Sequence, residues 1–188
     1  VMSQNEKFKK ATITNPDFLS GISEVAEKLD SRNAKLTILF ISNQYDVKTL
    51  SSEQIERLGE NVIACTTAGE IGRDGYHDHS ISGVAFHGSS FVVNTIFIKD
   101  LKNFNSTQAQ NFKDSYFDIK EQHKKALPTG KCFSILLVDG LSVREEVITG
   151  IIANVIEDTP LVGGSAGDGL NFISTKILVN GEFVEDSA

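Results

Sequence analysis

The 188-residue sequence has no apolar run long enough to cross a membrane, few cysteines and no excess of positive charge. A membrane-spanning helix needs about 20 apolar residues, and no stretch of this chain approaches that length. The net charge of -7 argues against a surface that binds nucleic acid or an anionic membrane. The polar N-terminus does not match a signal peptide. We therefore expect a cytoplasmic protein without nucleic-acid or membrane partners.

Only two cysteines are present, Cys65 and Cys132, and both lie in apolar, strand-like runs. A free, buried thiol is the usual state of such a cysteine in a reducing compartment. Cys65 could instead act as a nucleophile with His77 or His79 as its base, but its apolar neighbours favour an unreactive thiol. The hydrophobic content of 40% is typical of a globular chain with one core or two closely joined halves.

Apolar residues recur at helical spacing in four segments, and short β-branched runs lie between them. Helices are expected after Asn15-Pro16, from about Asp46 to Gly59, over 106–126, and after a capping box at 142–145. Buried strands are expected at 38–41, 62–65 and 135–138, a further strand at 170–179, and hairpins at 81–98 and around Asn180-Gly181. This order predicts an α/β (mixed α+β) fold in which mixed sheets pack against helices.

The two halves of the sequence resemble each other. Three pairs of segments align: 38–42 with 135–139, 61–70 with 159–168, and 85–88 with 178–181. We interpret them as a duplicated β-α-β-hairpin unit; a chance match of two α/β segments is the alternative. The expected organisation is an N-terminal segment and helix at 1–33, then one domain at 34–188. Two repeats, at about 34–100 and 132–188, would make up that domain and be joined by the helix at 106–126.

In each repeat a strand ends in small residues followed by an acid. Glycine permits positive φ and close approach of a ligand, hydroxyls and amides suit a carboxylate, and the acid suits an ammonium group. If the two turns meet, they can line one cleft for a zwitterion. The predicted ligand-binding residues are Thr66, Thr67, Ala68, Gly69, Glu70, Ser165, Ala166, Gly167, Asp168 and Asp139. The alternative is that small residues merely permit tight turns and close packing.

The stretch 72–79 is the most polar and histidine-rich part of the chain. The spacing of His77 and His79 would place both imidazoles on one side of an extended segment, a spacing that metal sites can use. Solvated loop histidines are the alternative. We expect this loop to be mobile without ligand, because a polar loop flanked by glycines has few packed contacts.

An enzyme is a further alternative, with two motifs to weigh. The segment GGSAG at 163–167 matches the G-x-S-x-G nucleophile motif of hydrolases. That motif must open a helix, whereas the residues that follow have a strand pattern and include no histidine. Neither turn carries the lysine of a phosphate-binding Walker loop.

The segments NVIACTTAGEIGRDGY, TPLVGGSAGD and ILLVDGLS resemble the N-terminal domain of the FIST family, named for F-box and intracellular signal transduction proteins. The resemblance runs from about Ala34 to the C-terminus. It implies a sensory input domain for small ligands, with amino acids proposed. We expect no enzyme, because no acid–base pair and no nucleophile with its base is evident in the sequence. It also implies a FIST C-terminal domain, expected to be absent from this chain, and signalling modules such as kinase or cyclic-dinucleotide domains. Some relatives are described as haem-containing nitric-oxide sensors, so haem at His77 or His79 is the alternative that the resemblance implies.

Overall fold

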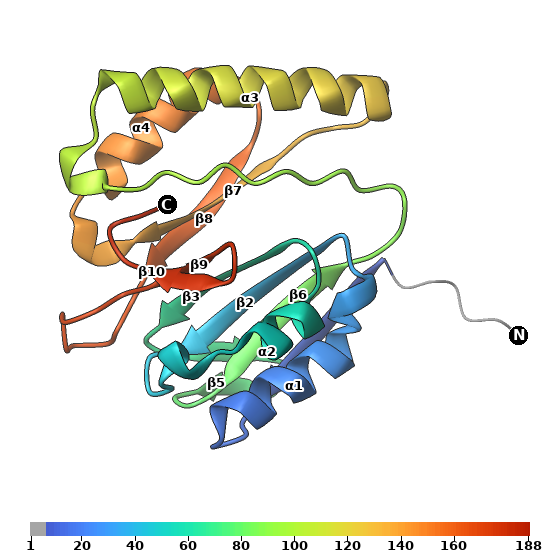
Figure 1. Ribbon diagram of the computed structural model, residues 1–188, viewed down its shortest axis with the longest axis vertical. Helices are drawn as coiled ribbons and strands as arrows, with labels where there is room; N and C mark the ends of the chain where they lie inside the picture. The colour runs from blue at the N-terminus through green and yellow to red at the C-terminus, as the bar shows by residue number, and fades with distance from the viewer. Residues whose placement is uncertain (1–6) are drawn as a thin grey trace, which may run out of the picture.

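The computed structural model describes residues 7–188 as a six-stranded mixed sheet, two two-stranded sheets and four α-helices (Figure 1). The helices are α1 (Phe18–Leu29), α2 (Ser52–Leu58), α3 (Ser106–Ala126) and α4 (Glu145–Ile156). The strands are β1 (Phe8–Ile13), β2 (Leu36–Ser42), β3 (Val62–Thr67), β4 (Glu70–Gly72), β5 (Gly75–His77), β6 (Ile81–Phe86), β7 (Ser134–Asp139), β8 (Leu161–Ala166), β9 (Ile177–Val179) and β10 (Glu182–Val184). The predicted mixed α/β fold is confirmed.

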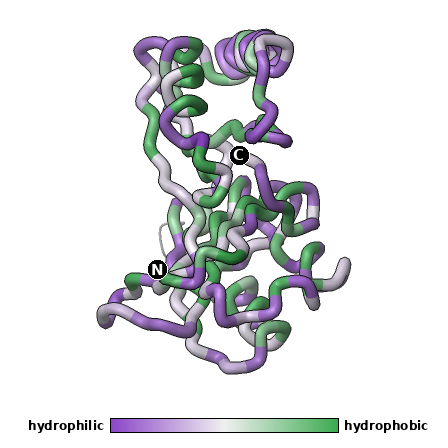
Figure 2. The backbone as a smooth tube through the Cα atoms, turned by 90° about the vertical axis from the view of Figure 1, so that its left-hand side faces the viewer, coloured by the Kyte–Doolittle hydropathy of each residue, from purple (hydrophilic) through white to green (hydrophobic). Residues whose placement is uncertain are grey.

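The six-stranded sheet has the order β1-β6-β2-β3-β9-β10, and within it only β2 and β3 run parallel. Nearly every residue of β2 is buried, which explains its almost continuous apolar sequence. Helix α1 packs on the sheet with Ile22, Val25 and Leu29, which recur at helical spacing. Figure 2 shows hydrophobic residues following the strands through the middle of the molecule. This sheet therefore carries the larger core.

Strands β7 and β8 form a separate parallel pair, and α4 connects them. Helix α3 lies beside α4 in the upper layer of Figure 1. The core of this layer is Ile98, Leu101, Phe112, Tyr116, Val138, Ile148, Ile152 and Ile156. A smaller apolar cluster joins it to the six-stranded sheet: Cys65, Leu137, Ala166 and Ile177. The two layers therefore pack against each other through β3, β7, β8 and β9.

Some local signals in the sequence predicted their elements well. Helix α3 covers the predicted residues because Asn105 and Gln108 form a capping box at its start. The hairpin β9–β10 turns at Asn180 and Gly181, which both have positive φ, as a type I′ turn requires. The capping box at 142–145 is wrong: the Ser142 hydroxyl donates to the Asp139 carbonyl instead, and α4 begins only at Glu145.

The strand predictions failed where strands pair with distant segments. The expected hairpin at 81–98 does not form, because β6 pairs with β2 and with β1, a strand that the sequence pattern did not indicate. Residues 91–98 contain no strand. Of the strand expected at 170–179, only β9 forms, and residues 167–176 are a loop. Hydrophobic alternation shows that a segment can pair but does not identify its partner.

The duplication remains a prediction. Both halves contain two parallel strands joined through a helix, β2–α2–β3 and β7–α4–β8. The strands that follow differ in position, because β6 pairs with β2 of its own half whereas β9 pairs with β3 of the other half. The register also differs by one residue from the sequence alignment: Ile135 lies opposite Val162 where Ile38 lies opposite Ile63.

Candidate functional site

The two repeated turns lie side by side, where four strands end. We call residues 66–70 the first turn and residues 165–168 the second turn. The Gly167 amide donates to the Thr66 carbonyl at 2.9 Å, which joins the end of β8 to the end of β3. The Asn43 amide donates to the Thr67 carbonyl at 3.0 Å and brings in the end of β2. Strand β7 ends beside β8 because these two strands pair in parallel. The carboxyl ends of β2, β3, β7 and β8 therefore converge, as they do at ligand sites of α/β sheets.

Gly69 allows a tyrosine to cover the first turn. The hairpin β4–β5 folds back so that a Cβ atom on Gly69 would lie 2.2 Å from the Tyr76 hydroxyl oxygen. The same hydroxyl donates to the Ala68 carbonyl at 3.3 Å. Neither Gly69 nor Gly167 has the positive φ that we expected; that conformation occurs at Gly169 instead. The close approach at Gly69 is therefore made by Tyr76.

Glu70 is buried at the end of the first turn, with 3% of its surface exposed. One carboxylate oxygen accepts from the Thr67 hydroxyl, and the other accepts from the Ser80 hydroxyl at 2.6 Å. Burial raises the pKa of Glu70, against the lowering effect of the hydrogen bonds from Ser80 and Thr67. Both oxygens already have partners, so this carboxylate holds the turn to the residues before β6.

Asp168 ends the second turn and is also buried. Its carboxylate accepts from the backbone amides of Phe172 at 3.0 Å, Ile173 at 2.6 Å and Ser174 at 3.0 Å. Burial alone would raise the pKa of Asp168, but these three amides outweigh it and the pKa is lowered. The charge of Asp168 therefore orders the loop that follows the second turn.

Asp139, the third predicted acid, has a similar role at the end of β7. One oxygen accepts from the Leu141 amide at 2.9 Å and from the Thr175 hydroxyl. The other accepts from the amide of Asp186. These bonds tie the end of β7 to the loop before β9 and to the C-terminal segment.

Of the predicted hydroxyl groups, only one lies on the surface. Thr66 is buried, and its hydroxyl accepts from the Lys176 amide at 2.9 Å, while the Thr67 hydroxyl is bonded to Glu70. Ser165 and Ala68 are exposed, whereas Ala166 is buried. The structure thus gathers the predicted residues at the ends of β3, β7 and β8, with Ser165 and Ala68 exposed.

Three further residues at this edge were missed from the sequence: Asn43, Tyr76 and Asp78. The half-buried Asn43 side chain lies beside Gly169, the residue after the second turn. The exposed Asp78 carboxylate raises the pKa of Tyr76, with burial as a second cause. Tyr76 and Asp78 lie in the polar stretch 72–79, in which only the histidines were predicted as possible ligands. Asn43 directly follows the buried strand β2, and this position at a strand end could have identified it from the sequence.

The two loop histidines have different surroundings. His77 lies 3.0 Å from the Asp74 carboxylate through Nε2. His79 stacks on Tyr45, with ring centroids 4.1 Å apart, and its Nε2 is buried without a hydrogen-bond partner in residues 7–188. A haem iron needs a histidine nitrogen that faces a slot for the macrocycle. The Nε2 atom of His77 is paired with Asp74 and that of His79 is buried, so neither histidine fits a haem ligand in this arrangement. Haem binding therefore stays an untested prediction.

The groups around the two candidate nucleophiles, Cys65 and Ser165, do not activate either side chain. Burial, with a further contribution from the charge of Glu70, raises the pKa of Cys65 to about 12, so the thiol stays protonated. Ser165 ends β8 and is followed by a loop, whereas a nucleophile elbow requires a helix there. Over residues 7–188, no cluster of three or more His, Cys, Asp or Glu side chains is arranged to hold a metal ion.

The fold and the convergent strand ends define an α/β domain whose two acidic turns lie together at one edge of two parallel strand pairs. Residues 35–188 match the family model described as the FIST N domain, and the chain therefore belongs to the FIST family. This is a family of sensory domains in signal transduction. No curated protein and no solved structure matched the chain. None of the helices described here is long and apolar enough to span a membrane.

Proposed function

We propose that this chain is a cytoplasmic, non-enzymatic input domain that binds a small polar metabolite, such as an amino acid, at the joined turns. The observation that carries the proposal is the convergence of four strand ends through the hydrogen bonds of Thr66 and Thr67 with Gly167 and Asn43. Strand ends that converge in this way leave backbone groups and short polar side chains facing one crevice. A zwitterion matches such a mixture of donors and acceptors.

The polar groups that are exposed or half-buried at this edge divide into two kinds. Ser165 of the second turn and Asn43, whose side chain lies beside Gly169, can donate to a ligand carboxylate. Asp78 and the Ala68 carbonyl can accept from an ammonium group, and both lie beside the Tyr76 hydroxyl. In this arrangement Tyr76 closes over the ligand from the β4–β5 hairpin.

The buried acids shape the site. Glu70, Asp168 and Asp139 accept hydrogen bonds from the protein itself, so they fix the two turns and the loop at 169–175. Their contribution to ligand binding is therefore the geometry of the turns. The exposed charge for an ammonium group comes from Asp78.

An apolar rim surrounds this edge and supplies a surface for the output partner. Besides Tyr76, four large apolar side chains are more than half exposed on the β4–β5 hairpin and on the loop after the second turn: Ile71, Leu170, Phe172 and Ile173. Exposed apolar groups of this size usually mark an interaction site. We infer that a FIST C-terminal domain, or a signalling module such as a kinase or cyclic-dinucleotide domain, contacts this rim and responds to the ligand.

The test is calorimetric titration with each of the amino acids, followed by matched variants. Asp78→Asn should weaken the best ligand about threefold to fivefold, because it removes one charge-assisted contact at an exposed site. Asp118→Asn, which removes an exposed acid on α3, should leave the affinity unchanged. If both variants bind as the wild type does, or if no amino acid binds, the proposed recognition is wrong.

A further inference from the structure

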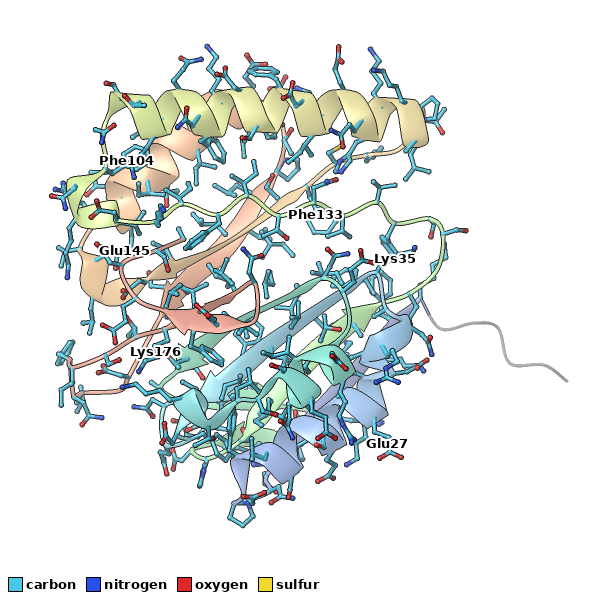
Figure 3. The ribbon with its side chains drawn as sticks, viewed as in Figure 1. Glu27, Lys35, Phe104, Phe133, Glu145 and Lys176 are labelled. Carbon is cyan, nitrogen blue, oxygen red and sulfur yellow. The ribbon has the colours of Figure 1, made fainter. Side chains whose placement is uncertain are left out.

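A cavity of about 590 Å³ lies between the two layers, away from the joined turns. It is bordered by the first residues of β3 and β7, among them Val62 and Ser134, whereas the turns lie at the last residues of these strands. In Figure 3, Phe133 lies in the space between the upper layer and the six-stranded sheet. The volume falls within the range of roughly 300–1,000 Å³ that is usual for small-molecule sites.

The walls of the cavity are apolar and come from several elements. Ile63 of β3 and Ile135 of β7 form part of two sides, and Tyr116 of α3 forms part of a third. At the rim, Phe133 and Phe97 are 53% and 36% exposed, so aromatic side chains lead from solvent into the cavity. Such walls suit an apolar molecule, because burying both charges of a zwitterion there would leave them without partners.

Polar groups gather on the α3 side of the cavity. Lys120 lies with its ammonium 5.6 Å from the centre of the Tyr116 ring, and within residues 7–188 it forms no ion pair. One turn further on, His123 Nε2 lies 2.7 Å from the Asn94 side-chain oxygen. Both Lys120 and His123 line the cavity, whose acidic residue is Glu60. This side therefore favours a negative group on the ligand.

We propose that this cavity binds an apolar small molecule with one anionic head group, of the kind represented by a medium-chain carboxylate. The hydrocarbon body lies between Ile63, Ile135 and Phe133, and the head group lies at Lys120 and His123. This is a second site, with a ligand chemistry opposite to that of the joined turns. A domain with both sites responds to two classes of molecule.

The lack of tryptophan in the chain makes a direct test possible. Phe133→Trp places a single tryptophan, which can be excited selectively, at the rim of the cavity, and Phe97→Trp is a second reporter at the same rim. Phe172→Trp, on the loop after the second turn, is the control, because Phe172 is exposed and does not line the cavity. Decanoate, below its micellar concentration, should shift the emission of the two rim reporters to shorter wavelength with saturation at one molecule per chain. The control emission should not change.

The head group is tested in the Phe133→Trp background. Lys120→Gln should weaken decanoate about threefold, the effect of one partly exposed charge, while decanol binding stays the same. Lys113→Gln, an exposed lysine elsewhere on α3, should change neither. Asp78→Asn should also leave decanoate binding unchanged, which separates this site from the joined turns.

Three results would overturn the proposal. The first is an equal emission change in Phe172→Trp, or a change in the rim reporters that never saturates, because either indicates nonspecific adsorption. The second is an unchanged decanoate affinity in Lys120→Gln. The third is a rim-reporter emission that follows protein concentration but not decanoate, because a second copy of the chain would then occupy the cavity.

Discussion

At the scale of single residues, Glu70 links the site to protein stability. Burial raises its pKa above the ordinary 4.5, so its protonated form favours folding and its ionised form opposes it. The stability that protonated Glu70 contributes is fully present below the unfolded-state pKa and is lost as pH rises through the folded-state pKa. In Glu70→Gln the side chain at this position has no proton to lose, so the contribution does not change with pH. The free energy of unfolding of the variant, relative to wild type, should therefore increase as pH rises above about 4.5. Urea denaturation across this pH range measures the difference, and parallel curves for the two proteins would contradict the assignment.

The two cysteines give a second prediction at this scale. Cys65 is buried with its pKa raised to about 12, and Cys132 is exposed. Since only a thiolate attacks a disulfide reagent, one thiol per native chain should react quickly and the second only after unfolding. Cys132→Ser should remove the fast reaction, whereas Cys65→Ser should keep it. Fast reaction of both thiols in the native protein would restore Cys65 as a candidate nucleophile.

At the scale of elements, the sequence predicted the elements that depend on short-range interactions and failed for those that depend on long-range pairing. Helix α3 and the turn at Asn180-Gly181 depend on hydrogen bonds and backbone angles within a few residues, and both were predictable. Strands β1 and β6 pair across about 70 residues of chain, as Ile13 with Ile81 shows, and no local pattern encodes that choice. The turns were predictable as a pair of small-residue segments. The hydrogen bonds of their acids were not predictable, because Asp168 accepts from amides of a loop that the pattern indicated as a strand.

The cap of α3 provides the prediction for this scale. Asn105 accepts from the amides of Thr107 and Gln108, so Asn105→Ala should lower the free energy of unfolding by about 1 kcal/mol. Asn111→Ala, at an exposed position inside the same helix, should change it little or raise it slightly, because alanine is the better helix former. Chemical denaturation of the three proteins gives the comparison. Equal losses in both variants would show that the cap does not contribute.

At the scale of the whole molecule, the sequence predicted which segments matter better than where they meet. The repeated turns suggested a shared cleft, and the structure places them in contact through Gly167 and Thr66. The residues that face outward at this contact, Asn43, Tyr76 and Asp78, come from other strands and loops. Their proximity is created by the packing of β2, β3 and β8 and by the hairpin over Gly69, which only the assembled fold supplies.

The central claim is that the joined turns bind a small polar ligand. The most direct measurement is an amide chemical-shift titration of the ¹⁵N-labelled protein with the amino acid that binds best in calorimetry. The account predicts saturable shifts centred on Ala68, Gly69 and Ser165, with the same dissociation constant at each. Shifts confined to the cavity around Phe133, or scattered over the surface without saturation, would contradict it.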